Sequence, residues 1–340
     1  MKRDFDVVIV GGAMAGAGTA ALLAAMPATA SLRVALVEPK PLTLPAADAP
    51  LDLRVSALSR ASQQLLEKTG AWPRVATKAG AFQRMVVWEQ RMDPAGSGAL
   101  VFDAAELGEP DLGHIAENRS VQAALTLRAQ EAGAVLLRAG FTTLETAGDS
   151  IRVSLDDGRE YRAALVVGAD GAESAVRRQA GIDVRGWDYG QRAVVAHLQP
   201  ERPHLETAWQ RFLDTGPLAL LPLADGRVSL VWSTLPATAE ELTACDEAEF
   251  AARVTNASAA VLGRLSPTSP RASFPLRLLH ARRYAAERIA LVGDAAHTVH
   301  PLAGQGINLA FLDAAALVDV LGAAVEAGDD PGELRVLRRY

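Results

Sequence analysis

The chain has 340 residues, of which 49% are hydrophobic, a composition that can bury a large core and excludes a disordered polypeptide. Its net charge of −6, without a sustained run of lysine and arginine, argues against a nucleic-acid-binding protein and favours a small-molecule partner. Cys245 is the only cysteine, which excludes an internal disulfide, a multi-cysteine metal site and a dithiol redox pair, so we predict no metal site and a reducing, cytoplasmic setting.

The first predicted unit is a strand, a helix and a second strand joined by a glycine-rich turn. Residues 5–10 form an apolar strand, residues 11–16 open an alanine-rich helix, and residues 34–37 form a second strand that ends at Glu38. This order predicts a βαβ dinucleotide site, in which the carboxylate of Glu38 accepts hydrogen bonds from the ribose hydroxyls of an adenosine. Pro27 and the many glycines and alanines make a membrane span or secretory signal a poorer interpretation of the same run.

The glycine-rich turn itself follows the dinucleotide fingerprint with one departure. Gly11 permits the tight turn and Gly16 permits close packing of the helix on the strand. Ala13 stands where the middle glycine usually brings the backbone nearest to the phosphates, and its methyl group calls for a small displacement. We still expect a pyrophosphate on this helix N-terminus, beside the backbone of Ala13, Met14 and Ala15.

The segments between residues 52 and 180 mix helices with antiparallel strands. Their patterns predict, in chain order, a helix over 60–69 with Ser59 as N-cap, a hairpin between 82 and 102 around the turn 93–96, a helix after the tripeptide Glu117-Asn118-Arg119, and a strand pair over 151–155 and 161–167. That pair ends at Gly168-Ala169-Asp170-Gly171, whose glycines permit a sharp strand-to-helix turn. Asp170 either fixes this turn or contacts a ligand, and both roles stay open.

From residue 189 to residue 232 the pattern becomes that of a second, antiparallel layer. Proline and glycine turns separate four predicted strands over 193–198, 207–212, 218–221 and 228–231. One or two helices between 239 and 265 complete this portion, and residues 274–276 are predicted to return to the first domain.

The last predicted unit is a buried strand over 289–292, a turn at Gly293-Asp294, and a long helix after Pro301. The helix is indicated by the apolar positions Ile307, Ala310, Phe311, Ala314, Leu317, Val318 and Leu321. The carboxylate of Asp294 could accept hydrogen bonds from ligand hydroxyls, while Gly304 and Gly306 let a ligand approach the backbone at the helix N-terminus. An ordinary corner with a solvated Asp294 is the alternative.

The ordered run Gly293-Asp294-Ala295-Ala296-His297, Pro301 and Gly304-Gln305-Gly306-Ile307-Asn308 resembles the second flavin-binding motif of the FAD-dependent aromatic hydroxylases. The runs 211–213 and 216–223 are most similar to the ubiquinone-biosynthesis hydroxylases within that family. The resemblance implies a Rossmann-like α/β FAD-binding domain of the p-hydroxybenzoate hydroxylase type, with an inserted, mainly antiparallel β-sheet substrate domain. Residues 1–80, 104–185 and 273–340 would form the FAD-binding domain, and residues 81–103 and 186–272 the substrate-binding domain. Such enzymes normally continue past the point where this chain stops, so their C-terminal tail is expected to be absent from it.

The resemblance also assigns residues to the cofactor. The implied FAD contacts are Gly11, Ala13, Met14, Ala15, Gly16, Glu38, Arg54, Arg119, Asp170, Asp294, Pro301, Gly304, Gly306, Ile307 and Asn308. The loop Pro301, Gly304, Gln305 and Gly306 would face the flavin ring, and no catalytic side chain is identified. The substrate pocket would lie between the sheet of residues 189–232 and the flavin. Without the resemblance, Arg54 is a surface arginine and Arg119 a solvated charge at a helix start. His297 and His300 are candidates for a catalytic role, but a structural, hydrogen-bonding role is the preferred interpretation of either histidine.

The function implied is hydroxylation of the aromatic ring of a polyprenylated phenol in ubiquinone biosynthesis, with FAD as cofactor, O2 as oxidant and NAD(P)H as a transient co-substrate. Another flavoenzyme of this fold, a halogenase or a prenyl reductase, is one alternative, and a non-catalytic lipid-binding subunit is another. Attachment to the periphery of the inner membrane, membership of a biosynthetic complex and a homo-oligomeric state stay open.

Overall fold

The computed structural model describes residues 2–41, 44–46 and 49–340, so Met1, the first residue of the predicted FAD-binding domain, lies outside the described residues. Sheet A carries the predicted strand–helix–strand unit: β1 pairs in parallel with β2 and with β11, and β11 pairs in parallel with β19. Its strands, in spatial order, are β18 (Ala285–Ala286), β19 (Ile289–Leu291), β11 (Glu160–Gly168), β1 (Phe5–Val10), β2 (Val34–Val37) and β8 (Val135–Leu137), with β10 (Ser150–Leu155) and β9 (Phe141–Ala147) attached through β11.

Both faces of sheet A are buried, because alternate residues of its central strand enter two different cores. Val7 and Ile9 pack with helices on one face, whereas Val8 and Val10 pack against the β9–β10 side. The helices of the first face are α1 (Met14–Ala25), α4 (Asn118–Glu131) and α8 (Gln305–Ala327). Nearby lie α2 (Arg60–Lys68), α3 (Trp72–Ala76), α5 (Ala175–Gln179) and α9 (Leu334–Leu337).

The long helix α8 confirms the predicted apolar spacing, since Ala310, Phe311, Ala314, Leu317, Val318 and Leu321 are all buried. Its length and mean hydropathy of 1.7 would also suit a membrane span, but half of the apolar window is buried inside the protein, where α8 packs on α1. The predicted N-cap of α2 is confirmed as well, because the Ser59 side chain accepts from the backbone N–H of Ser62. A small sheet B, of β3 (Val55–Ser59), β7 (Gly113–Glu117) and β4 (Gly80–Phe82), lies beside α2 and α3.

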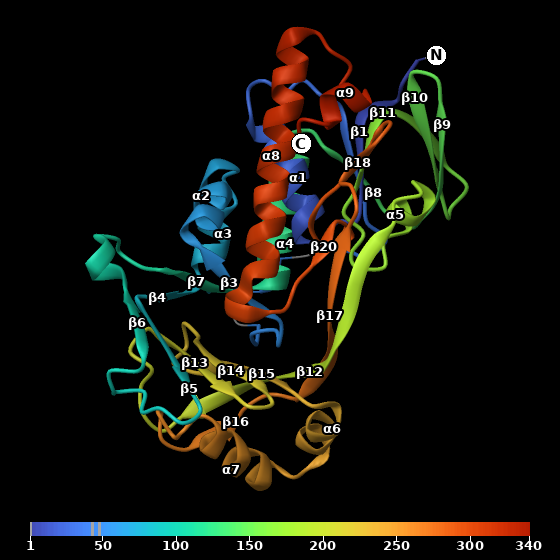
Figure 1. The fold of residues 1–340 in the computed structure, drawn as a ribbon. Helices are drawn as coiled ribbons and strands as arrows, with labels where there is room; N and C mark the ends of the chain where they lie inside the picture. The colour runs from blue at the N-terminus through green and yellow to red at the C-terminus, as the bar shows by residue number, and fades with distance from the viewer. Residues whose placement is uncertain (1, 42–43, 47–48) are drawn as a thin grey trace.

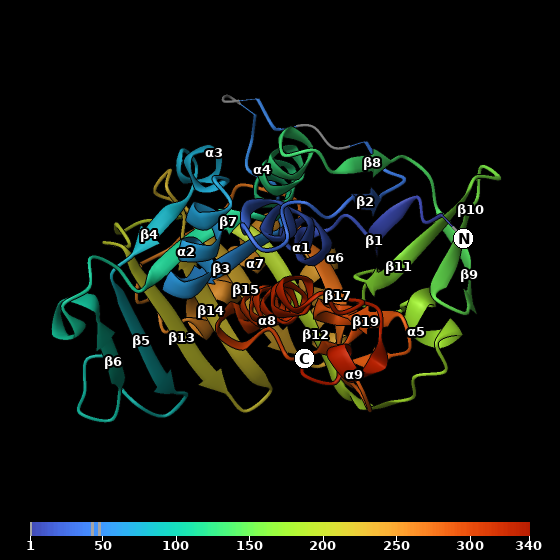
Figure 2. The ribbon, with the colours of Figure 1, turned by 90° about the horizontal axis from the view of Figure 1, so that it is seen from above.

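Sheet C is the second layer that the sequence predicts. Its strands, in spatial order, are β20 (His297–Thr298), β17 (Ala272–Ala281), β12 (Val184–Pro200), β15 (Val228–Thr234), β14 (Gly216–Pro222), β13 (Thr207–Leu213), β5 (Arg84–Glu89) and β6 (Leu100–Asp103), with β16 (Leu265–Pro267) on β12. The helices α6 (Pro236–Ala244) and α7 (Glu247–Ala257) cover one face, and Figures 1 and 2 show α1 and α8 on the other side of the sheet.

Two long strands join the layers. β12 is 17 residues long and pairs with β17 from Val184 opposite Ala281 to Val195 opposite Ala272, and Figure 1 shows both strands rising from sheet C towards sheet A. The predicted domain boundaries at 185/186 and 272/273 therefore fall inside the β12–β17 ladder, whose register shifts between Asp188 and Gln191. The β5–β6 hairpin reaches sheet C through parallel pairing of β5 with β13. The division into two domains stays a prediction.

Candidate functional site

A cavity of about 930 Å³ lies between the strand ends of sheet A and the exposed face of sheet C. On one side it is lined by residues that directly follow four parallel strands: Gly11 after β1, Glu38 after β2, Asp170 after β11 and Asp294 after β19. Carboxyl ends of parallel strands are where open α/β sheets bind ligands, because the strand-to-helix turns leave a crevice there.

The turn after β1 places the N-terminus of α1 at this cavity, and Ala13, Met14 and Ala15 line it. Gly11 has φ +102°, and a Cβ on it would lie 2.4 Å from the carbonyl oxygen of Ala169, so only glycine fits. The predicted departure at Ala13 causes no backbone strain, because its φ is −66°. No described side chain caps α1, so its first N–H groups are available to an anion.

The structure shows which groups Gly16 and Glu38 contact. A Cβ on Gly16 would lie 1.9 Å from the carbonyl oxygen of Gly11, so only glycine permits this close packing of the helix on the turn. Gly16 does not line the cavity. The carboxylate of Glu38 lines the cavity and also accepts hydrogen bonds from the N–H groups of Gly12, at 2.9 Å, and Lys40, at 3.0 Å. Glu38 therefore stabilises the glycine turn in addition to facing the site.

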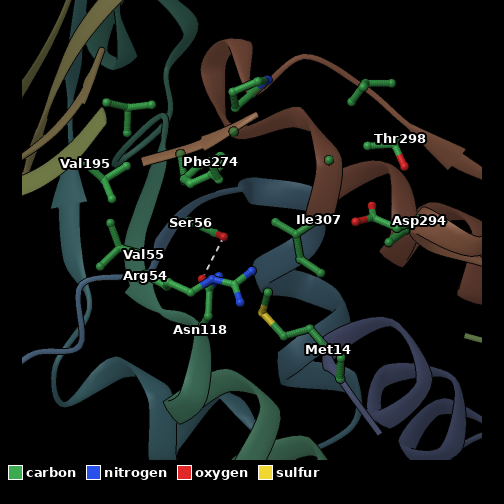
Figure 3. A pocket seen from close by; sticks show the side chains of 18 of the residues that line it. Met14, Arg54, Val55, Ser56, Asn118, Val195, Phe274, Asp294, Thr298 and Ile307 are labelled. Atoms are coloured by element: carbon green, nitrogen blue, oxygen red, sulfur yellow. Dashed lines mark hydrogen bonds between the residues drawn. The ribbon is translucent and has the colours of Figure 1, made fainter. Parts of the chain in front are cut away.

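The N-terminus of α8 opens onto the same cavity. Gly304, its N-cap, has φ +64°, and a Cβ there would meet the Cβ of Ala57 at 2.9 Å. Open space surrounds the position where Gly306 would carry a Cβ, and Pro301, Gly304, Gly306 and Ile307 all line the cavity. Figure 3 shows Ile307, Met14 and Arg54 pointing towards one another from three separate elements. Two helix N-termini thus converge on one space.

Asp294 also points into this space, as Figure 3 shows, and its side chain is solvent-accessible from the cavity. The surrounding protein raises the pKa of Asp294 by burial, and the positive charges of His297, Arg54 and Arg277 partly oppose that shift. A carboxylate in this position can accept hydrogen bonds from ligand hydroxyls.

A buried histidine and aspartate hold the turn that carries Asp294. One oxygen of Asp313, on α8, accepts from the backbone N–H of Gly293 at 2.9 Å and contacts Nε2 of His297 at 2.7 Å. Burial lowers the pKa of His297, but the hydrogen bond and charge of Asp313 raise it by more, so the net shift is upward. This geometry agrees with the structural interpretation of His297. His300 contacts the Tyr189 ring, and burial lowers its pKa.

Arg54 lines the cavity on a loop that polar contacts hold in place. Two contacts of Asp52 hold the loop. The carboxylate of Glu117 accepts from the backbone N–H of Asp52 at 2.6 Å, and the carbonyl oxygen of Asp52 lies 3.0 Å from Nε2 of His197 on β12. Burial lowers the pKa of His197, so its ring is neutral and bonds to that carbonyl through an Nε2–H. These contacts hold the loop between the layers, while the exposed side chain of Arg54 lines the cavity.

Three other predicted residues, Arg119, Asn308 and Gln305, lie outside the cavity lining, and a fourth, Asp170, lines the cavity but uses its carboxylate within the protein. Arg119 lies outside the lining, with its guanidinium bonded to Glu117 and to the carbonyl of Pro50. The buried side chain of Asn308 bonds to Ala57, Ser59, Ser62 and Gly304, and Gln305 is exposed outside the lining. Asp170 lines the cavity, but its carboxylate accepts from Ser174 and from the backbone of Ala175 and Val176, which caps α5.

Several cavity residues were absent from the sequence predictions. They are Ser56, Asn118, Arg277 and Thr298, together with the sheet C face formed by Met85, Val195, Ala208, Gln210, Ala219, Leu221, Ser229, Val231 and Phe274. Alternation along 207–212 could have indicated that Ala208 and Gln210 share a face. It could not indicate which face looks towards the helix N-termini.

The residues present fit an FAD molecule. The uncapped N-terminus of α1 suits a pyrophosphate, Glu38 and Asp294 suit ribose and ribityl hydroxyls, and the glycine-lined N-terminus of α8 suits the edge of a flavin ring. Gly11 and Gly304 occur where an added Cβ would collide with the backbone or side chain behind the cavity. The donor set is that of a dinucleotide site.

Comparisons with known proteins agree with this geometry. A family model described as FAD binding domain matches residues 4–334. The 3-demethoxyubiquinol 3-hydroxylase of Escherichia coli (strain K12) is 40% identical over 342 residues, covering 100% of this chain and 85% of that protein. The mitochondrial ubiquinone biosynthesis monooxygenase COQ6 of Rattus norvegicus is 36% identical, covering 99% of this chain and 79% of that protein. The structure of P. aeruginosa PqsL in complex with 2-aminobenzoylacetate matches with a TM-score of 0.76 at 27% identity, covering 95% of this chain and 88% of PqsL.

Proposed function

Because this chain belongs to the FAD binding domain family and is a flavin-dependent aromatic-ring monooxygenase, we propose that it hydroxylates the ring of a polyprenylated phenol in ubiquinone biosynthesis. FAD is its cofactor, and NAD(P)H and O2 are its co-substrates. The predicted fold class, a Rossmann-like α/β FAD-binding domain of the p-hydroxybenzoate hydroxylase type with an inserted antiparallel sheet, is confirmed.

The apolar face of sheet C is the observation that carries the substrate proposal. The cavity-lining residues that the structure describes on β12, β13, β14 and β15 include no charged side chain. Val195, Leu221 and Val231 instead offer aliphatic surface, against which each buried CH2 of a prenyl chain would contribute about 0.8 kcal/mol. On these four strands a benzoate would find no cation to pair with its carboxylate, since the lining cations Arg54 and Arg277 lie outside them.

The chain's own residues bind, orient and exclude water in this proposal. Bound FAD supplies the redox chemistry, accepting hydride from NAD(P)H and activating O2. The N-terminus of α8 would stabilise negative charge at the ring edge, because Gly304 and Gly306 at this N-terminus line the cavity and no described side chain caps the helix. Asp294 and Glu38 fix the cofactor through its hydroxyls, and the sheet C face holds the phenol ring against it. These assignments stay proposals for each residue.

A long prenyl chain also bears on where the protein works. A cavity of about 930 Å³ is shared by cofactor and phenol ring, so we propose that the chain of the substrate leaves it for a lipid or protein surface. A cytoplasmic protein attached to the periphery of the inner membrane, or to a biosynthetic complex, would meet that requirement. Association with a second copy stays a prediction.

The test is substrate-stimulated NAD(P)H oxidation coupled to hydroxylated product, measured for prenylated phenols and for the matching benzoates. We expect prenylated phenols to be hydroxylated with the higher kcat/KM, because only they fill the apolar wall. Equal efficiency on a charged benzoate would contradict the ubiquinone proposal and leave the broader aromatic hydroxylase. A halide-dependent product, reduction without oxygen insertion, or a protein that stays colourless after FAD addition would each support one of the alternatives.

A further inference from the structure

The cavity face of sheet C contains one buried amide among aliphatic side chains. Backbone pairing aligns Val195 with Val231, Val231 with Ala219, and Ala219 with Gln210, so these four residues form one row across β12, β15, β14 and β13. Side chains of paired residues point to the same face of a sheet. All four residues line the cavity, and the intervening residues Val194, Leu218, Leu220, Leu230 and Trp232 pack under α6 and α7 instead.

Gln210 is 6% exposed, no hydrogen bond between described residues involves its side-chain amide, and the amide atoms are not among the fully buried unpartnered ones, so they face the cavity. Its strand neighbours on the cavity face are Ala208 and, across the ladder, Ala219, and neither side chain offers a polar atom. An amide that faces an apolar cavity without a protein partner is satisfied by water or by a ligand, and a ligand that displaces the water without replacing its hydrogen bonds loses about 1–3 kcal/mol. The small neighbours leave room for such a ligand in front of the amide.

We propose that Gln210 is a specificity-determining residue, whose amide hydrogen-bonds the oxygen substituent of the phenol ring on the sheet C side of the cavity. This inference rests on the proposed function. An amide suits a phenol because it offers both a donor and an acceptor, whereas a guanidinium or ammonium would select a carboxylate. One directional bond on an otherwise apolar wall also fixes the rotation of the ring, and thereby which ring carbon faces the cofactor.

Ser229 lies one row further along the same face and extends this polar surface. It is 1% exposed, it lines the cavity, and its Cα partner on β14 is Leu221. No hydrogen bond joins its hydroxyl to another side chain or backbone group of the described chain. A second oxygen on the ring would meet Ser229, whereas a ring with a single oxygen needs only Gln210.

The experiment compares two ligands on the FAD-loaded protein: a short-chain prenylated phenol and the prenylated benzene that lacks the hydroxyl. Dissociation constants are read from the change in visible absorbance of the bound FAD, so the reactivity of the ring does not enter. The parent should prefer the phenol, because the benzene leaves the Gln210 amide unpaired. In Gln210→Leu, and in Gln210→Met, which keeps the length of the side chain, that preference should fall about tenfold.

Val231→Ala is the matched control, since it removes apolar surface from the same row without touching a polar group. It should weaken both ligands equally and leave their ratio at the parent value. An unchanged ratio in the Gln210 variants, with FAD retained, would overturn the inference while leaving the substrate class intact. Loss of FAD from both Gln210 variants would assign the residue a structural role and overturn it as well. If the parent binds neither ligand, the proposed function fails first.

Discussion

The two walls of the cavity recognise their ligands by different means. The sheet A wall presents the uncapped N-terminus of α1 and the carboxylates of Glu38 and Asp294, held by turns of contiguous residues. The sheet C wall presents aliphatic side chains and the amide of Gln210, which meet only through strand register. An added atom at Gly11 would collide with the backbone of the first wall, whereas a substitution of one side chain could alter ligand preference at the second wall without moving the backbone.

Each wall is backed by a histidine, and the two pKa values shift in opposite directions. His297, behind the sheet A wall, has its pKa raised overall by Asp313. His197, behind the sheet C wall, has its pKa lowered by burial and bonds as a neutral ring to the Asp52 carbonyl. The pair of His297 and Asp313 holds the turn of Asp294, while His197 holds the loop of Arg54.

The largest expected effect breaks the sheet A wall at Gly11. Gly11→Ala forces an alanine into φ +102° with its Cβ 2.4 Å from the Ala169 carbonyl oxygen, which should cost on the order of 3 kcal/mol of folding free energy. Urea denaturation measures this loss, and visible absorbance should show little bound FAD. Gly158→Ala is the matched control, with φ +85° but open space around the Cβ, and it should cost clearly less. Equal losses would show that backbone conformation, not close approach, makes Gly11 necessary.

A second change separates the two histidines by pH. The raised pKa of His297 means that its stabilising charge is fully present below its ordinary pKa of 6.5 and is lost as pH rises through the raised value. Asp313→Asn should therefore destabilise the protein by about 1.5–3 kcal/mol at pH 6, and by less at pH 9.

Urea unfolding of parent and variant at both pH values gives this difference, in which the opposite contribution of His197 cancels because both proteins retain it. A cost that stays constant, or grows, from pH 6 to pH 9 would contradict a charged His297. His197 by itself stabilises the fold above pH 6.5 and loses that contribution as pH falls, since its folded-state pKa is lowered.

The smallest expected effect concerns the cofactor alone. Asp294→Ala should weaken FAD binding by about 1–3 kcal/mol, because ribityl hydroxyls would lose a carboxylate acceptor. FAD occupancy is read from visible absorbance after dialysis. Leu221→Ala, on the sheet C wall, should keep the FAD occupancy of the parent, because we assign FAD binding to the sheet A wall and substrate binding to the sheet C wall. The same occupancy in Asp294→Ala and the parent would remove Asp294 from the proposed FAD contacts.

The sequence by itself determined the elements whose stability is local. The apolar strands 5–10 and 34–37, the Ser59 cap of α2 and the apolar face of α8 were all predictable, because hydrophobic period and capping act over a few residues. The motif turns were predictable for the same reason, and the resemblance to the flavin hydroxylases rested on them.

Only the tertiary structure decided what each motif residue touches. Arg119 and Asn308 belong to matching motifs, yet contacts with Glu117 and with Ser59 and Ser62 hold them outside the cavity lining. Asp170 lines the cavity, and its carboxylate accepts hydrogen bonds from Ser174 and from the backbone of Ala175 and Val176, as the turn-fixing role that the sequence left open requires.

Which residues of sheet C face the cavity was likewise beyond the sequence. Alternation along 207–212 could have placed Ala208 and Gln210 on one face, but which face is covered by α6 and α7 depends on packing between segments far apart in the chain. Pairing of β12 with β17 crosses the predicted domain boundaries for the same reason. Strand register is set by contacts across the whole sheet, and a local pattern contains no information about its partner.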